Sequence, residues 1–392
     1  MADEHFRTCN LCEAMCGIVV ETEGDRVTRI HGDGLDPFSR GHVCPKAMAL
    51  ADLHHDPDRL RTPLRREGER FVPIAWDDAF DLAARRLRAL QAAHGKDAVA
   101  LYQGNPTVHN LGSILTSPFF SRALGTRNRF SATSVDQLPH MLASYLMFGH
   151  QLLLPVPDID RTQYMLVIGA NPAVSNGSLM SAPGAAERLD AIRERGGKVV
   201  VLDPRRSETA KHASEHHFVR PGSDVFFLLA FVRTLFAEGA VRMGGLSELA
   251  RGVDALRQLV EPFTPERVAQ HVGLGAPDIV RLVREFSQAQ RAVCYGRVGV
   301  SMQEFGALCC WLINVINVLT GNLDRVGGAM FTQPAIDPMR LKLLPMVRGN
   351  FARYRSRVRQ LPEFGGELPV AVLAEEIETA GPGQIRALVT AA

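Results

Sequence analysis

Short, wholly apolar runs alternate along most of this chain with longer stretches of helical periodicity. Apolar runs of about four to eight residues are typical of strands that are covered on both faces. The runs that predict buried strands lie at 98–102, 164–168, 198–202 and 292–295. The stretches that predict helices lie at 76–93, 138–148, 184–195, 224–238, 277–290 and 303–320. Because strands that alternate with helices at this spacing form parallel βαβ units, the pattern predicts an α/β fold.

Both ends of the chain depart from this alternation. Residues 17–31 carry two β-branched runs around the turn signal Glu23–Gly24–Asp25, which predicts a hairpin. Residues 385–392 predict a final strand that no ligand loop follows. The predicted organisation is a small domain at 1–60, a connecting segment with the first strand at 61–110, and doubly wound, Rossmann-like parallel-sheet domains at 111–392, the second starting near 265.

Composition narrows the class of protein. The chain has 392 residues, 46% of them apolar and 22% charged, which fits a globular protein of two or three domains. A net charge of +2 gives no reason to expect a nucleic-acid partner. No apolar run reaches the roughly 18 residues of a membrane span, and we expect neither a signal peptide nor a membrane span. Seven cysteines, four of them clustered, suit metal-binding thiols in a reducing compartment, so we expect a cytoplasmic protein.

The clustered cysteines form a three-plus-one pattern. Cys9, Cys12 and Cys16 share one short loop, and Cys44 follows after residues 17–43. Such a pattern suits a 4Fe–4S cubane, because one tight loop can supply three of its corners and a remote loop the fourth. A Cys₄ zinc site is the alternative, although it normally uses two paired Cys-x-x-Cys knuckles. The other cysteines lie in apolar stretches and are predicted to pack in the core: Cys294, Cys309 and Cys310.

Polar residues follow several of the predicted strands. In open α/β sheets, ligands bind at the carboxyl ends of the strands, and helix starts at that edge favour phosphate. The candidate cofactor-binding residues at these positions are Asn171, Pro172, Ser175, Asn176, Asp203, Arg205, Gly222, Asp224 and Arg297. Asn, Gly, Pro and Asp are also ordinary turn residues, so turn formation is the alternative interpretation of each.

The motifs along the chain, in their order, resemble one known family. They are Cys-x2-Cys-x3-Cys-x27-Cys-Pro-Lys, His55-x-Pro57-x-Arg59-Leu60, Trp76-Asp77-x-Ala79, Gly169-Ala-Asn-Pro172, Asp203-Pro-Arg205 and Gly321-Asn-Leu-x3-Gly-Gly328. Together they resemble the molybdenum and tungsten bis-pterin oxidoreductases of the dimethyl-sulfoxide-reductase superfamily, in the branch with an N-terminal 4Fe–4S cluster. The resemblance implies a small iron–sulfur domain before two parallel-sheet domains. A C-terminal barrel domain would follow in the family, and we expect this chain to be truncated before it.

The resemblance also implies the cofactors and several roles. The cofactors would be a 4Fe–4S cluster on the four clustered cysteines and a metal on two molybdopterin guanine dinucleotides, bound by the strand-end loops. Lys46 follows Cys44–Pro45, where the family has a lysine between the cluster and one pterin that helps electrons to pass. A solvent-exposed lysine without this role is the alternative.

Three residues are candidates for the side chain that would bind the metal. By spacing from Gly125–Thr126, Asp136 stands where the family ligand falls, and Ser134 or Ser131 could serve instead. No cysteine occurs between Cys44 and Cys294, and a hard oxygen ligand suits a high-valent molybdenum or tungsten ion. The alternative is that Asp136 caps the helix at 138–148, and both interpretations can hold together.

Other polar residues invite weaker hypotheses. His109 and His140 are candidate proton carriers, and each could equally be an ordinary hydrogen-bonded histidine. Five arginines between 348 and 359 are interpreted as a solvated helix face or a docking surface.

The sequence therefore predicts a molybdenum- or tungsten-dependent oxidoreductase that acts on a small-molecule substrate and exchanges electrons with a redox partner protein or subunit. The alternatives are an iron–sulfur electron-transfer module without metal catalysis and a non-redox hydratase of the same family. Formate dehydrogenase and periplasmic nitrate reductase are disfavoured. Their metal position would carry Cys or selenocysteine, and the formate enzymes a His directly after it, where this chain has Gln137.

Overall fold

The computed structural model describes residues 2–334, 337, 339 and 348–391. The chain divides into two compact units. The first contains residues Met1–Ser134 and Asn350–Ala392, and the second contains Val135–Gly349.

The first unit begins with a three-stranded antiparallel sheet. Its strands are β1 (Asp3–Thr8), β2 (Gly17–Glu23) and β3 (Arg26–Gly32). β2 and β3 form the hairpin that the sequence predicts, whereas β1 was not predicted. Two short helices, α1 (Pro45–Met48) and α2 (Leu50–His55), pack on β3. A small core that contains Cys9 and Cys16 lies between these elements.

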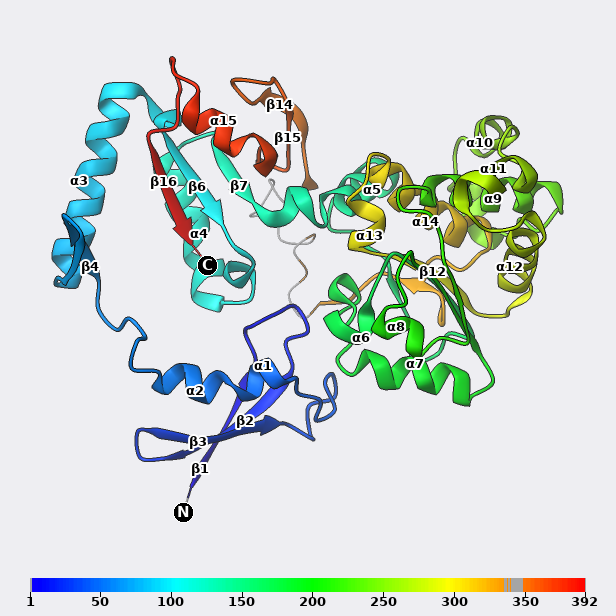
Figure 1. The fold of residues 1–392 in the computed structure, drawn as a ribbon, viewed down its shortest axis with the longest axis horizontal. Coiled ribbons are helices and arrows are strands. Elements are labelled where there is room, and N and C mark those ends of the chain that lie inside the picture. The colour runs from blue at the N-terminus through cyan, green and yellow to red at the C-terminus, as the bar shows by residue number, and fades with distance from the viewer. Residues whose placement is uncertain (1, 335–336, 338, 340–347, 392) are drawn as a thin grey trace. The chain divides into compact units, whose positions relative to one another are not determined.

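A second sheet of the first unit is parallel. Its order is β16 (Ala387–Ala391), β6 (Val99–Gln103) and β7 (Arg129–Ser131). The remaining elements of this unit are β4 (Leu64–Glu67), β5 (Arg70–Pro73), α3 (Trp76–His94), α4 (Leu111–Leu124), β14 (Phe351–Arg355), β15 (Pro362–Phe364) and α15 (Leu373–Glu378). Figure 1 shows the last strand, β16, alongside β6, so the two sequence segments that make up this unit meet in one sheet.

The arginine-rich segment is not a helix face, so that alternative was wrong, whereas the docking surface stays a prediction. Arg353 and Arg355 lie in β14, and Arg353 pairs at 2.8 Å with Glu363. Arg357 pairs at 3.2 Å with Glu376. Since the side chains of both acids are fully buried, these arginines are needed as counter-charges inside the unit.

The second unit is built on a four-stranded parallel sheet. Its order is β11 (Glu215–His217), β10 (Lys198–Leu202), β9 (Tyr164–Ile168) and β12 (Ala292–Gly296). The helices of this unit are α5 (Leu138–Phe148), α6 (Pro172–Ser175), α7 (Ala185–Glu194), α8 (Glu208–Lys211), α9 (Asp224–Ala237), α10 (Val253–Val260), α11 (Pro265–Val272), α12 (Ala276–Gln288), α13 (Val298–Ser301) and α14 (Gly306–Leu319). A two-stranded ribbon, β8 (Val156–Pro157) with β13 (Ala329–Met330), completes it.

Helices cover both faces of this sheet. Leu166 and Ile168 of β9 face the core formed with α9, α11, α12 and α14. Met165 and Val167, the alternate residues of the same strand, face α7 and the loop before it. Alternation of buried residues between two covered faces explains why these strands read as continuous apolar runs in the sequence. Figure 1 shows α7 and α8 on one side of the sheet and α9 to α12 on the other.

The chain reverses its direction of winding at β9. It runs outward from β9 through β10 to β11, and then returns so that β12 pairs with the other side of β9. The expected fold class, with two parallel sheets, is confirmed, and the described residues contain no barrel. The expected boundary near residue 265 is wrong, because β12 joins β9 in one sheet and β16 joins β6 in the other.

Among the described residues, no helix combines the length and the apolar character that crossing a membrane would require.

One buried amide completes the edge of the main sheet. Asn317 of α14 is 1% exposed, and its side chain accepts from the Cys294 N–H and donates to the Cys294 carbonyl, both at 2.9 Å. The amide thus replaces a neighbouring strand for one residue of β12.

We expect Asn317→Ala to lower the free energy of unfolding by about 2–4 kcal/mol, because it leaves a buried N–H and a buried C=O unpaired. Asn314→Ala is the matched control on the same helix, and it should change stability much less. Urea unfolding monitored by circular dichroism measures both. Equal losses in the two variants would contradict the role assigned to Asn317.

Candidate functional site

In the first unit, a tight turn brings three cysteines together. The Cys9 N–H donates to the Cys16 carbonyl at 2.8 Å, and the Met15 N–H donates to the Cys12 carbonyl at 3.2 Å. Met15 adopts φ +43°, a left-handed conformation that closes the turn. The loop between β1 and β2 is therefore fixed by its own backbone before any cofactor contributes.

A close contact between Gly32 and Gly41 positions the fourth cysteine, Cys44, at the same small core. A Cβ on Gly32 would lie 2.0 Å from the Gly41 carbonyl oxygen, so no other residue fits at position 32. The loop after β3 then leads to Cys44, which caps α1 and packs with Cys9 and Cys16. The predicted convergence of residue 44 with the first three cysteines is thus found in the structure.

The thiols oppose each other's ionisation. Burial and then the neighbouring Cys12, Cys9 and Cys44 raise the pKa of Cys16 to about 11. Burial chiefly raises the pKa of Cys9 also, and the charge of nearby Lys46 acts in the opposite direction. Four thiolates at such a site require a strongly positive group among them.

An iron–sulfur cluster fits this arrangement. Among the described residues, no three His, Cys, Asp or Glu side chains lie close enough to share one metal ion. A cubane does not require such sharing, because each thiolate binds its own iron. Lys46 itself is exposed on α1.

In the second unit, loops from three strands meet at the carboxyl edge of the sheet. The Asn171 amide after β9 donates to Glu208 at 2.7 Å and accepts from the Thr209 N–H at 3.0 Å. These partners lie on α8, after β10. Asn171 therefore ties two of the predicted cofactor loops together, and neither partner had a local sequence signal.

The loop after β9 is preformed. Pro172 is buried at the start of α6, and the Ser175 hydroxyl donates to the Asn171 carbonyl at 3.3 Å. Left-handed conformations at Asn176, φ +52°, and Gly177, φ +80°, then reverse the chain. Turn formation, the alternative interpretation of these residues, is thus part of how the loop is built.

The loops after β10 and before α9 carry two carboxylates. Asp203 accepts from the Arg205 N–H at 2.8 Å. Asp224 is 7% exposed and accepts from the Gln303 amide at 2.8 Å. Burial, and to a lesser extent the charge of Asp203, raises the pKa of Asp224. Gly222, with φ +77°, forms the turn that leads to Asp224.

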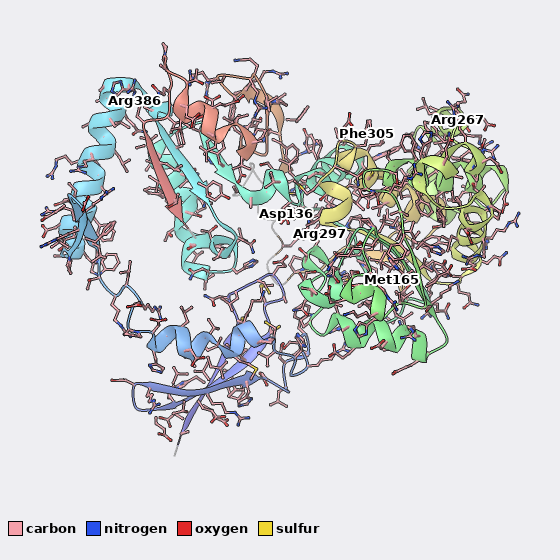
Figure 2. All side chains as sticks on the ribbon, in the orientation of Figure 1. Asp136, Met165, Arg267, Arg297, Phe305 and Arg386 are labelled. Carbon is pink, nitrogen blue, oxygen red and sulfur yellow. The ribbon has the colours of Figure 1, made fainter. Side chains whose placement is uncertain are left out.

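Arg297 lies at the point where the winding reverses, immediately after β12. It is 4% exposed, and its guanidinium forms an ion pair with Asp136 at 2.6 Å and donates to the Ser178 hydroxyl at 2.8 Å. Figure 2 shows Asp136 and Arg297 next to each other, and the two residues lie on the segments directly before α5 and α13. The predicted metal ligand and a predicted cofactor residue are thus in direct contact.

The structure separates the candidates for the metal ligand. Asp136 is not the cap of α5, so that alternative was wrong: Gln137 occupies the cap position and makes no side-chain hydrogen bond there. Ser131 donates to Glu367, and Ser134 accepts from the Val370 N–H at 2.9 Å, both within the first unit. These two serines fix a neighbouring loop, whereas Asp136 faces Arg297.

The two histidines have different environments. His109 is largely buried, with its Nε2 3.8 Å from a Glu13 carboxylate oxygen in the cysteine loop. His140 lies on α5 beside a cavity of about 30 Å³ that Ser144 and Asn317 also line. Its Nε2 has no hydrogen-bond partner within the described part of the chain. Burial, and secondarily Arg297, lower the pKa of His140 to about 3, so His140 is neutral at physiological pH.

A metal–pterin cofactor fits the second unit on two observations. The polar loops converge at the point where the strand order reverses, which is where open parallel sheets bind ligands. The buried Arg297 also keeps a donor, Nε, without a partner among the described residues. A buried guanidinium with spare donors suits an anionic ligand such as a phosphate.

The chain combines a small cysteine domain with a doubly wound sheet. Polar loops lie at the switch point of this sheet, where the strand order reverses. These features define a class, the redox-cofactor-binding α/β proteins. The comparisons identify the family. The molybdopterin oxidoreductase profile matches residues 59–389, and the profile of the molybdopterin oxidoreductase Fe4S4 domain matches residues 7–56. The chain belongs to the molybdopterin oxidoreductase family, and its cofactors are a 4Fe–4S cluster and a molybdenum or tungsten bis-pterin.

Several characterised proteins are similar to this chain. Formate dehydrogenase H of Escherichia coli is 26% identical over 81% of this chain and 44% of its own length. The thiosulfate reductase molybdopterin-containing subunit PhsA of Salmonella typhimurium is 28% identical over 82% and 41%. Nitrate reductase of Symbiobacterium thermophilum is 26% identical over 83% and 44%. The chain thus spans less than half the length of these relatives.

One solved structure has the same fold. Acetylene hydratase from Pelobacter acetylenicus superposes with a TM-score of 0.71 at 22% identity, over 81% of this chain and 43% of that one. At this identity the match establishes the fold alone.

The depressed pKa of His140 predicts how stability depends on pH. The pKa of His140 is about 3 in the folded protein, against 6.5 in the unfolded chain. A histidine with such a lowered pKa makes its full contribution to the stability of the fold above the unfolded pKa, and this contribution is lost as the pH falls. Between pH 7 and pH 5 the loss from this group is about 2 kcal/mol. We expect His140→Gln to show that much less acid destabilisation than the unsubstituted protein in urea unfolding at the two pH values. The same pH dependence in both proteins would show that His140 is not buried as a neutral base.

Proposed function

We propose that this chain is the cluster- and pterin-binding portion of a molybdenum or tungsten oxidoreductase. The observation that carries the proposal is the convergence of the strand-end loops on Arg297 and Asp136 at the switch point of the second unit. Support comes also from the four cysteines, which meet in one small core of the first unit.

Residues of the first unit would bind the iron–sulfur cluster. Cys9, Cys12 and Cys16 would supply three thiolates and Cys44 the fourth, as their shared core supports. Lys46, whose charge reaches Cys9, would favour the more negative reduced state of the cluster.

Residues of the second unit would bind the dinucleotide cofactor. Asn171 and Pro172 shape the loop that Ser175 and Asn176 would use to bind phosphate. Asp203 and Asp224, at the neighbouring strand ends, would accept hydrogen bonds from the nucleoside part, with Arg205 and Gly222 in the same turns. Arg297 would add a charged donor.

The chain's own residues would prepare the reaction site. When bound, the metal and its pterins supply two-electron chemistry and the cluster supplies single-electron transfer. Asp136 would give the metal an oxygen ligand. Asp136 is preferred to Ser131 and Ser134 for this role because both serines form hydrogen bonds within the first unit. His140, neutral and buried, would provide a hydrogen-bonding ring and not an imidazolium proton donor.

The substrate would be a small molecule, and a redox partner protein or subunit in the cytoplasm would exchange electrons with the cluster. The similar proteins named above include a formate dehydrogenase and a nitrate reductase. An oxygen ligand from Asp136, with Gln137 after it, argues against formate dehydrogenase activity and periplasmic-type nitrate reductase activity for this chain. A substrate screen with a dye acceptor under anaerobic conditions would identify the activity.

One observation favours a second function, an electron-transfer module without metal catalysis. The Asp136 carboxylate is already paired with Arg297, as it would be in a protein that had lost its metal site. Metal analysis distinguishes the two functions. We expect anaerobically purified protein to contain about four iron atoms and one molybdenum or tungsten per chain. Iron alone, without molybdenum, tungsten or pterin, would leave only the electron-transfer module.

The cluster ligands can be tested separately. We expect Cys44→Ser to lower the iron content and abolish the electron paramagnetic resonance signal of the reduced cluster, because Cys44 would supply the fourth corner and the remaining cysteines are buried in the second unit. Cys294→Ala, at a buried cysteine of β12, is the control and should keep both. An intact cluster in Cys44→Ser would refute the ligand assignment.

A further inference from the structure

The two oxygens of the Asp136 carboxylate are not equivalent. Oδ1 is buried and lies 2.6 Å from Nη1 of Arg297, in an ion pair that is not aligned as a hydrogen bond. The side chain as a whole is 42% exposed, and Oδ2 makes no hydrogen bond with any described residue. One oxygen is therefore committed to the protein, and the other faces outward.

Arg297 is held too firmly to follow a movement of Asp136. Its side chain is 5% exposed, and Nη2 donates to Ser178 at 2.8 Å. Its carbonyl accepts from the Val300 N–H at 2.9 Å and the Ser301 N–H at 3.0 Å, in the first turn of α13. A buried guanidinium that lost its carboxylate would be left as an unpaired charge, so the pair resists opening.

The backbone of Asp136 is fixed by the same segment. The Ser301 hydroxyl donates to the Asp136 carbonyl at 2.9 Å. The carboxylate and the main chain of Asp136 are thus both attached to residues 297–301, which follow β12 directly. This double attachment sets the direction in which Oδ2 points.

We propose that Arg297 is a positioning residue that occupies Oδ1 of Asp136 and so allows Asp136 to bind the metal through Oδ2 alone. The inference rests on the proposed function, in which Asp136 is the metal ligand. Carboxylates bind hard metal ions with either one oxygen or two. Arg297 selects the first mode, because its ion pair and the second metal–oxygen contact would need the same atom.

X-ray absorption spectroscopy of metal-loaded protein tests the inference by counting oxygen neighbours of the metal. In the unsubstituted protein we expect one carboxylate oxygen. In Arg297→Gln, which frees Oδ1, we expect a second oxygen at similar distance and a changed electron paramagnetic resonance spectrum of the pentavalent metal. Arg297→Lys, which keeps a positive charge near Oδ1, should restore the single oxygen. Arg193→Gln, at an exposed arginine of α7 that pairs with Asp190, is the matched control and should change neither spectrum.

The outcomes separate this inference from the function on which it rests. Two carboxylate oxygens in the unsubstituted protein would overturn the inference even if every variant failed to fold. A spectrum of Arg297→Gln that matches the unsubstituted protein, while Asp136→Asn changes it, would overturn it too and leave Asp136 as the ligand. If Asp136→Asn leaves the metal spectrum unchanged, Asp136 is not the ligand, and both the assignment and the inference fail.

Discussion

A contact between two glycines determines the geometry of the second unit's site. The Gly299 N–H donates to the Gly169 carbonyl at 2.9 Å, which joins the chain after β9 to the chain after β12. A Cβ on Gly169 would lie 2.8 Å from the Val300 nitrogen, and Gly169 has φ +54°. Because no side chain fits between these segments, Arg297 is brought against the loop that carries Ser178, and the remaining contacts of the site follow.

The buried arginine then constrains its neighbours. A guanidinium that is 4% exposed requires compensation by charge and hydrogen bonds, and Asp136 and Ser178 provide part of it. Asp136 comes from the segment before α5, Ser178 from the loop after β9, and Arg297 from the segment after β12. The contacts that compensate the Arg297 charge therefore join three separate segments. Nε of Arg297 has no hydrogen-bond partner among the described residues, so an anionic group can bind the guanidinium from that side.

The sequence predicted what depends on local pattern. The central strands were found because both of their faces are covered: Leu166 is buried in one core and its neighbour Val167 in the other, which yields unbroken apolar runs. The meeting of Cys44 with the first three cysteines followed from the chemistry of a cubane. What the sequence could not show were pairings between distant residues, such as Ser301 with Asp136, which are 165 positions apart. The partner of β16 was missed for the same reason, since an edge strand carries no signal for which sheet it joins.

The charges at the switch point also explain why His140 differs from a usual catalytic histidine. Arg297 already places one buried positive charge beside it, and a second one on His140 would be opposed by both burial and repulsion. Asp136 balances Arg297, so the pair is close to neutral as a unit. In the function proposed above, Asp136 would stabilise a highly charged metal only as far as Arg297 leaves its negative charge available. The strength of that ion pair, and not the presence of Asp136 alone, would then set how strongly the protein binds the metal from this side.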